Sequence, residues 1–382
     1  MKRLWSLLTA ALMLFVLLPI PAIAAGPEVA AKSAVLMDMT TGTVLAEQNA
    51  HEKLAPASVT KVMTMLLIME AIDSGKIHWD DTVIASETAS AKGGSQIYLK
   101  VGETMSVSDM VKSIAVSSAN DCACAMAEHI AGSEQAFVEM MNRRAEELGM
   151  KDTHFVNCTG LDDSPEAAEH RTSAYDIALM SRELMVKHPD IRKFTTIWMD
   201  TIRDGAFGLA NTNKMVRFYP GATGLKTGFT SGAGYCLSAT AQRENLALVA
   251  VVMGAETSQV RFGATKQLLD YGFANYALIA PETPGGTVAV KLGKADTVQA
   301  VPAEPVQLLV DKAQVNQVLV ETVLEEQVPA PVSKGQRLGT LTVKVGEQTV
   351  RQIPLVAEEA VPRLTWWDIF LRILRKVAMA KD

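Results

Sequence analysis

The sequence lacks the short motifs that mark nucleotide-dependent and metal-dependent enzymes. No GxxxxGK[ST] or GxGxxG element occurs, so a nucleotide cofactor has no support. The six histidines show no HExxH or other ligand spacing, which argues against a metal site and against a zinc peptidase. A net charge of -6 at pH 7 argues against a nucleic-acid partner. We therefore expect a protein that uses no cofactor, no metal and no nucleic acid.

Cysteine is scarce, with four in 382 residues. Cys122 and Cys124 are two positions apart on a predicted helix, where side chains do not face each other. Cys158 and Cys236 are isolated in the sequence. We expect four small buried side chains and no disulfide framework.

An apolar run occurs near the N-terminus, and it has fewer residues than a helix that spans a membrane usually needs. Residues 1–3 carry positive charge, residues 4–20 are apolar, and Ala22-Ile23-Ala24 is a small-x-small cleavage site. This order is typical of a secretory signal peptide over residues 1–25, with an uncleaved anchor as the alternative. No cysteine follows the run, which excludes lipoprotein processing. We expect the mature chain outside the cytoplasm, whether secreted, in a periplasm or in the cell-wall space.

The stretch that organises the chain is Ala55–Lys61, with the sequence APASVTK, followed by an apolar run over residues 63–69. A helix that is apolar nearly all round has to be buried. We therefore expect Ser58 in the first turn of a core helix, with Lys61 on the same face. A helix N-terminus suits a developing anion, and burial makes the neutral form of a lysine easier to reach. A serine nucleophile needs these conditions when no histidine acts as its base. The alternative is that Ser58 only caps the helix and that Lys61 lies at the surface.

Two further elements follow in order, Ser118-Ala119-Asn120 and Lys226-Thr227-Gly228. Together with Ser58-x-x-Lys61 they form the active-serine set of penicillin-binding proteins and class A β-lactamases. The wider sequence resembles the low-molecular-mass D-alanyl-D-alanine carboxypeptidases of the penicillin-binding protein 5/6 type over essentially the whole mature chain. The segments that carry this resemblance are 36–38, 45–47, 57–64, 118–121 and 268–273.

The resemblance implies a role for each residue of the first two elements. Ser58 attacks a carbonyl and forms an acyl-enzyme, and Lys61 takes its proton. Ser118 relays a proton to the leaving amine. Asn120 hydrogen-bonds both Lys61 and the substrate amide, which holds the geometry.

The third element is expected to bind the substrate. Lys226 adds positive charge beside the cleft, and its strand, which includes Gly228, can pair with an extended peptide. Thr227 offers a hydroxyl to the substrate carboxylate, and the resemblance implies an oxyanion hole made by the backbone N–H groups of Ser58 and Phe229. Arg261 matches the arginine that binds the substrate carboxylate in the family, with a surface ion-pair residue as the alternative.

The predicted fold class is α+β. A hairpin over residues 33–48 and strands at 224–230, 235–241 and 246–253 predict one antiparallel sheet, with the intervening helices as a cluster beside it. That agrees with the transpeptidase/β-lactamase-like fold that the resemblance implies. From residue 280 the sequence alternates and is rich in valine, which predicts a small all-β sandwich. The expected division is a signal peptide at 1–25, a serine DD-peptidase catalytic domain at 26–279, a β domain at 280–362 and an amphipathic helix at 363–382.

The C-terminal segment is predicted to anchor the protein at a membrane surface. At 100° per residue, Trp366, Trp367 and Phe370 fall on an apolar side, while Asp368 and Arg372 fall on the other. Such a helix lies in the interface and is too short and too charged to span the bilayer. We expect contact with the outer face of the cytoplasmic membrane, and a helix packed on the β domain is the alternative.

The predicted function is removal of the terminal D-alanine from peptidoglycan pentapeptide stems, with β-lactams as inhibitors. A class A β-lactamase would need Glu-x-x-Leu-Asn between the second and third elements, but Glu166 is followed by Ala-Ala-Glu-His. Without that second base, penicillin should trap the enzyme. A DD-endopeptidase, a transpeptidase and a non-catalytic peptidoglycan-binding protein remain alternatives, and the sequence does not indicate the oligomeric state.

Overall fold

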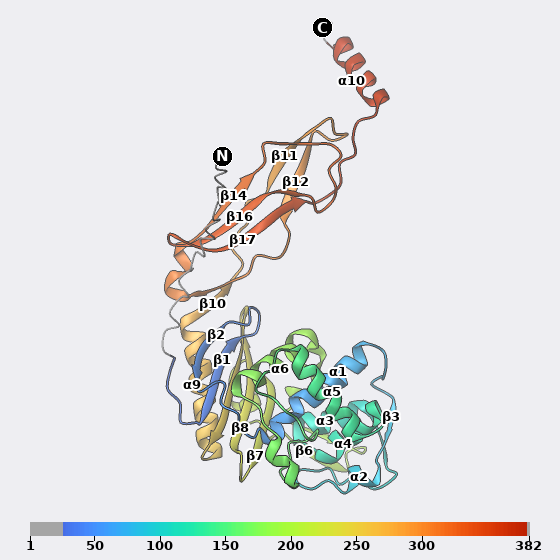
Figure 1. Ribbon diagram of the computed structural model, residues 1–382, viewed down its shortest axis with the longest axis vertical. Coiled ribbons are helices and arrows are strands. Elements are labelled where there is room, and N and C mark those ends of the chain that lie inside the picture. The colour runs from blue at the N-terminus through green and yellow to red at the C-terminus, as the bar shows by residue number, and fades with distance from the viewer. Residues whose placement is uncertain (1–25, 380–382) are drawn as a thin grey trace, which may run out of the picture.

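The computed structural model describes residues 26–379, so the expected signal peptide lies outside the described residues. Figure 1 shows a mixed helix and strand body at one end, a narrower β-rich part beyond it, and a single helix at the far end. Within residues 26–379, no helix has the length and the apolar character needed to cross a bilayer.

The larger body is built on a five-stranded antiparallel sheet in the order β2-β1-β9-β8-β7. Its strands are β1 (Ser33–Asp38), β2 (Val44–Gln48), β7 (Ala222–Thr230), β8 (Gly234–Arg243) and β9 (Leu246–Ala255). The three later strands were predicted, with ends that differ by one or two residues. Strand β7 lies at one edge of the sheet, so its outer side is not paired with another strand of the sheet.

The sheet separates two hydrophobic cores because alternate side chains of a strand point to opposite faces. On the central strand β9, Val249 and Val251 face the helical cluster. Their neighbours Leu248 and Ala250 pack instead with Leu268 of helix α9 (Ser258–Asn275). Strand β9 is therefore covered on both faces, which explains why its sequence is continuously apolar. Figure 1 shows α9 on one side of the sheet and the long helices α1, α3, α4, α5 and α6 on the opposite side.

The helical cluster surrounds α1 (Lys61–Asp73), whose side chains are nearly all buried, as predicted. Its other long helices are α3 (Val107–Ser117), α4 (Asn120–Ala131), α5 (Glu134–Glu147) and α6 (Ala174–Lys187). Ser106 caps α3 by accepting a hydrogen bond from Asp109 N–H at 3.1 Å. The short elements of this body are η1 (Ala57–Thr60), β3 (Thr82–Ile84), α2 (Glu87–Ser90), β4 (Thr104–Ser106), η2 (Pro165–Glu169), η3 (Pro189–Ile191), α7 (Arg192–Thr195), β5 (Met199–Ile202), β6 (Phe207–Ala210) and α8 (Met215–Phe218).

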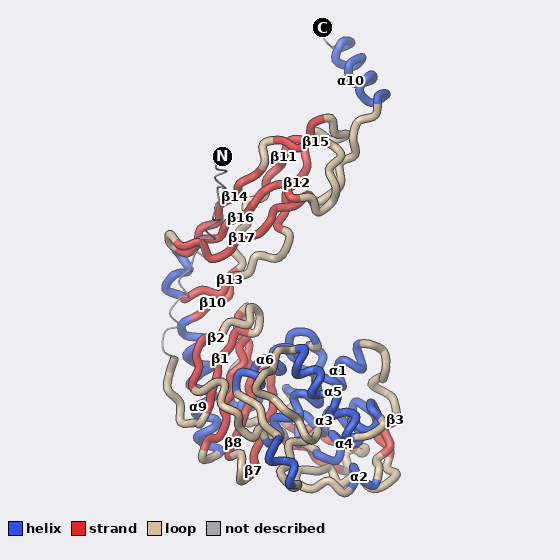
Figure 2. Tube along the Cα trace, in the orientation of Figure 1, coloured by secondary structure: helices blue, strands red, loops and turns tan. Residues whose placement is uncertain are grey.

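The second part is β-rich, as predicted, and contains a six-stranded sheet in the order β14-β16-β17-β12-β11-β15. Its elements are β11 (Gly286–Lys291), β12 (Thr297–Pro302), η4 (Lys312–Gln317), β14 (Val318–Leu324), β15 (Gln327–Pro329), β16 (Arg337–Val345) and β17 (Gln348–Ala357). Both halves of this sheet contribute to one core, for example through Val288 and Leu341. A separate pair, β10 (Tyr276–Ile279) with β13 (Leu308–Asp311), lies between the two parts, as Figure 2 shows. The last element, α10 (Trp366–Met379), extends beyond the β-rich part.

The four cysteines are free and buried, as expected. One detail differs from the sequence analysis, because Cys158 is not isolated in space. Its thiol lies 3.2 Å from a carboxylate oxygen of Glu134, and the Cys124 thiol lies 3.9 Å from the other oxygen of that carboxylate.

Candidate active site

Ser58 and Lys61 lie together at the start of α1. Lys61 Nζ donates hydrogen bonds to Ser58 Oγ at 2.9 Å and to the carbonyl oxygen of Thr159 at 2.8 Å. The Lys61 side chain is fully buried, and this burial lowers its pKa to about 7, against smaller opposing effects of Cys158 and Asp121. A neutral amine is therefore accessible near pH 7 within hydrogen-bonding distance of a serine hydroxyl.

The turn that presents Ser58 differs from the predicted first turn of an α-helix. Ser58 lies in the 3₁₀ turn η1, and Lys61 is the first residue of α1. Ala57, just before the serine, has a φ of 48°, a left-handed conformation that L-residues rarely adopt. Strand β7 passes beside this turn, and a Cβ on Gly228 would lie 2.7 Å from Pro56 O and 3.1 Å from Ser58 N. Gly228 is therefore required for the close approach of the strand to the serine.

Ser118 and Asn120 lie at the junction between α3 and α4, and both of these helices pack against α1. Ser118 is buried and has a φ of 64° at the end of α3. The expected hydrogen bond between Asn120 and Lys61 is not formed. Asn120 Nδ2 instead donates to Gly93 O at 2.7 Å, and its buried Oδ1 has no partner within residues 26–379. A buried amide oxygen without a partner is suited to accept a hydrogen bond from a ligand.

The third element lies on strand β7. Lys226 is buried, and its pKa is lowered far below the usual value, first by burial and then by the nearby cations Lys61 and Arg261. Thr227 Oγ1 donates to Thr212 Oγ1 at 2.6 Å. Phe229 is half exposed, and its ring lies 4.3 Å from the ring of Tyr235.

Arg261 is buried and does not form the surface ion pair that was the alternative. Its Nη1 donates to Gly228 O at 3.2 Å and to Cys236 O at 3.3 Å, so the guanidinium lies behind strand β7. Its Nη2 donates to Ser258 Oγ at 3.3 Å, and its buried Nε has no partner within residues 26–379. Burial lowers its pKa to about 10.

The structure adds residues that the sequence analysis did not single out. Thr159 supplies the carbonyl that binds Lys61, and Gly160 lies so close to the serine turn that a Cβ there would be 1.8 Å from Ala57 O. Thr212 contacts Thr227 from the segment before α8. Gly160 and Thr212 do not belong to a recognisable sequence motif. Thr159 acts through its backbone carbonyl, which no sequence pattern marks.

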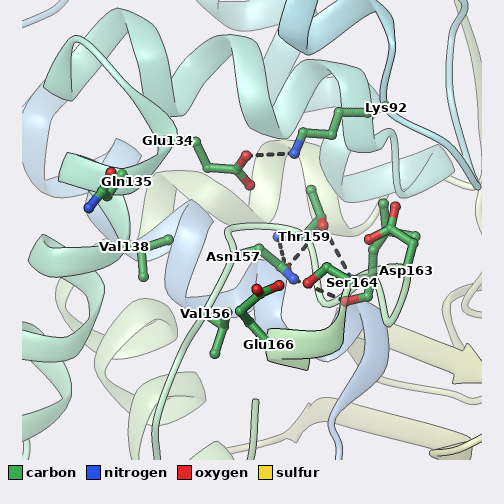
Figure 3. A pocket seen from close by; sticks show the side chains of 11 residues that line it. Lys92, Glu134, Gln135, Val138, Val156, Asn157, Thr159, Asp163, Ser164 and Glu166 are labelled. Carbon is green, nitrogen blue, oxygen red and sulfur yellow. Dashed lines mark hydrogen bonds and ion pairs between the residues drawn. The ribbon is translucent and has the colours of Figure 1, made fainter. Parts of the chain in front are cut away.

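A cavity of about 340 Å³ lies beside the loop that carries Thr159. Figure 3 shows its lining, which includes Glu166, Asn157 and the ion pair between Lys92 and Glu134. Ser58 and Lys61 are not among its lining residues. Glu166 is exposed and is not a hydrogen-bond partner of Ser58 or Lys61, so its position gives no support to a β-lactamase base.

Two sequence-family models match successive parts of the chain. The sequence model of the family described as D-alanyl-D-alanine carboxypeptidase matches residues 21–257, and that of the penicillin-binding protein 5 C-terminal domain matches residues 273–363. D-alanyl-D-alanine carboxypeptidase DacF of Bacillus subtilis (strain 168) is 46% identical over 336 residues, covering 86% of this chain and 85% of that protein.

Two solved structures are also similar. Penicillin binding protein 5 from Haemophilus influenzae superposes with a TM-score of 0.75 at 30% identity, over 89% of this chain and 100% of that one. Penicillin-Binding Protein D2 from Listeria monocytogenes in its ampicillin-bound form has a TM-score of 0.60 at 32% identity, over 65% of this chain and 100% of that one. This chain belongs to the D-alanyl-D-alanine carboxypeptidase family.

Proposed function

We propose that Ser58 is the nucleophile of a serine-type D-Ala-D-Ala carboxypeptidase that removes the terminal D-alanine from peptidoglycan pentapeptide stems. Ser58 Oγ forms an ester with the carbonyl carbon of the penultimate D-alanine, and the amide bond to the terminal D-alanine breaks. Water then hydrolyses the ester and frees Ser58. The observation that carries this proposal is the 2.9 Å contact between Ser58 Oγ and a buried lysine whose pKa is about 7.

The proton movements use residues around that contact. Lys61, in its neutral form, takes the proton of Ser58. Ser118 passes a proton to the nitrogen of the departing D-alanine. Asn120 uses its unpartnered Oδ1 to accept a hydrogen bond from the substrate amide.

Substrate binding is assigned to strand β7 and the cations behind it. The outer edge of β7 is free of other strands of its sheet, so an extended peptide can add to that edge through main-chain hydrogen bonds. The terminal carboxylate is bound by the Thr227 hydroxyl and by Arg261, with Lys226 adding positive charge. The N–H groups of Ser58 and Phe229 stabilise the oxyanion.

β-Lactams are proposed to acylate Ser58 as substrate mimics. The ampicillin-bound state of the similar protein from Listeria monocytogenes supports this. Residues 166–170 do not match the motif of a second base, so the penicilloyl ester should hydrolyse slowly.

Helix α10 is proposed as an in-plane anchor at the outer face of the cytoplasmic membrane. Its polar residues contact the β-rich part, because Arg372 pairs with Asp296 at 3.0 Å and Asp368 with Lys294 at 3.6 Å. Its apolar residues are left exposed: Trp366, Trp367, Ile369, Phe370, Leu371, Ile373 and Leu374. A monomeric soluble surface rarely exposes such a patch, whereas an interfacial helix needs one. We also propose that the catalytic domain ends at residue 279 and that the β domain ends at residue 362, where the anchor segment begins.

The decisive experiment is to incubate the protein with a labelled penicillin and with a pentapeptide that ends in D-Ala-D-Ala. We expect a label on Ser58 and release of free D-alanine, both abolished in Ser58→Ala while the fold is retained. Labelling of Ser58→Ala at the wild-type stoichiometry would contradict the assignment. An amine acceptor added to the same assay separates transpeptidation from hydrolysis, and a cross-linked dimeric stem peptide tests endopeptidase activity.

A further inference from the structure

A buried histidine lies next to the serine turn, and no step proposed above uses it. His170, at the end of η2, is 3% exposed, and its ring lies 5.6 Å from that of Phe155. Both ring nitrogens have partners, since Nδ1 lies 3.1 Å from Val156 N and Nε2 lies 2.8 Å from Thr60 Oγ1. A backbone N–H can only donate, so Nδ1 is the acceptor and the proton of the neutral ring is on Nε2.

Thr60 connects this histidine to the residue before Ser58. Its hydroxyl donates to Ala57 O at 2.8 Å, so the same oxygen accepts the hydrogen bond from His170 Nε2–H. The result is a directed chain from His170 through Thr60 to the carbonyl of Ala57. Both His170 and Thr60 are buried, so water does not compete for these bonds.

The carbonyl of Ala57 and the N–H of Ser58 belong to one planar peptide group. Holding the oxygen in place therefore fixes the direction of the Ser58 N–H. That N–H has no protein acceptor within residues 26–379, and a Cβ on Gly228 of strand β7 would lie 3.1 Å from its nitrogen. The left-handed φ of 48° at Ala57 is unfavourable for an L-residue, so the peptide needs such restraints to keep this orientation.

We infer that His170 is a positioning residue that acts through Thr60 to orient the Ser58 N–H as an oxyanion donor. The inference rests on the proposed function, in which Ser58 is the nucleophile. A hydrogen bond accepted by a peptide carbonyl also polarises that peptide, so its N–H becomes a better donor. Because the oxyanion forms only in the transition state, losing this orientation slows acylation and leaves substrate binding nearly unchanged.

The test measures acylation by a labelled penicillin, with the limiting rate constant separated from the half-saturating concentration. Thr60→Val removes the middle hydroxyl while keeping the shape of the side chain. His170→Gln places an amide N–H near the position of Nε2, whereas His170→Asn reaches only the position of Nδ1. His188→Asn is the matched control, because His188 is a buried histidine bonded to Asp73 away from Ser58.

We expect Thr60→Val and His170→Asn to lower the limiting rate constant about tenfold or more, with the half-saturating concentration within about twofold of wild type. His170→Gln should stay within about threefold of wild type, and His188→Asn should be unchanged. The inference is overturned if Thr60→Val acylates at more than half the wild-type rate, or if His170→Gln falls as far as His170→Asn. If the His170 variants do not fold, the acylation rate of Thr60→Val alone tests the inference, which is overturned if that rate exceeds half of the wild-type rate. A wild-type protein that is not labelled at Ser58 would overturn the proposed function itself.

Discussion

Gly160 lies directly against the carbonyl oxygen of Ala57, and a Cβ added to Gly160 would fall 1.8 Å from that oxygen. Gly160 also has a φ of 82°, so a side chain there would be strained as well as crowded. The loop that carries Thr159, the acceptor for Lys61, is thus packed against the backbone of the serine turn.

Gly160→Ala is the first prediction. The clash has to move either the serine turn or the Thr159 carbonyl, so we expect penicillin acylation to fall at least about tenfold. The thermal midpoint should also fall, with a loss of stability on the order of 2 kcal/mol. Acylation kinetics and circular dichroism melting measure the two effects.

Gly149→Ala is the matched control for this prediction. Gly149 has a φ of 74°, but a Cβ there would meet nothing within 4 Å. It should lose stability through its φ alone, on the order of 1 kcal/mol, and keep wild-type acylation. Equal acylation rates in the two variants would show that the Gly160 contact does not matter for the site.

The second prediction concerns pH. Only the neutral amine of Lys61 can accept the Ser58 proton, and burial lowers the pKa of Lys61 to about 7. The acylation rate should therefore be low in acid, rise through about pH 7 and level off above it. Lys61→Arg should abolish the reaction, because a guanidinium does not give up its proton in this range. An acylation rate that stays flat between about pH 5 and pH 9 would remove Lys61 from the role of base.

The third prediction concerns Arg261. Arg261→Ala leaves the substrate carboxylate without its bidentate partner, at a cost of about 2–3 kcal/mol, so kcat/KM for D-alanine release should fall roughly 30- to 150-fold. Acylation by penicillin should fall less. Arg243→Ala serves as the control, since this arginine, at the end of β8, lies over the rings of Tyr219 and Phe273. Turnover of Arg261→Ala within twofold of wild type would leave Arg261 with only a packing role.

The fourth prediction concerns α10. The double variant Trp366→Glu, Phe370→Glu places charge on exposed side chains whose rings stack 5.8 Å apart. Co-sedimentation with vesicles of phosphatidylglycerol and phosphatidylethanolamine should fall about tenfold or more, because burial of each ring at the membrane contributes about 2 kcal/mol. Activity on a soluble peptide should not change.

Val323→Glu is the control for the α10 variant. Val323 is an exposed apolar residue on β14 of the same β-rich part, so it tests the effect of surface charge alone. It should bind vesicles as the wild type does. Full vesicle binding by the α10 double variant would show that this helix is not the anchor.

Much of the fold could be predicted because its signals are local. The continuous apolar sequence of β9 and the nearly all-apolar α1 each indicate burial, and a serine such as Ser106, the N-cap of α3, is typical of a helix start. The exact start of α1 could not be predicted, since a 3₁₀ turn and a first α-helical turn have the same sequence preferences.

The candidate site residues that the sequence singles out are those whose chemistry is carried by side chains in contiguous motifs, as for Ser58, Lys61 and Lys226. Thr159 escaped because it acts through a backbone carbonyl, which every residue has. The sequence analysis did not single out Gly160 and His170, because they contact Ala57 and Thr60, which are distant in the sequence. The partner of Asn120 was predicted wrongly for the same reason, since the Gly93 carbonyl is presented by a separate loop.

Burial lowers the pKa of three basic side chains near the proposed nucleophile, Lys61, Lys226 and Arg261, and repulsion from the charges of Lys61 and Arg261 lowers that of Lys226 further. An anion that enters between them relieves this repulsion, so a ligand with a free carboxylate should raise the thermal midpoint by more than its size suggests. The same peptide with an amidated C-terminus leaves the repulsion in place. Discrimination against chains that continue beyond the second D-alanine would then arise from the electrostatic strain of the empty cleft.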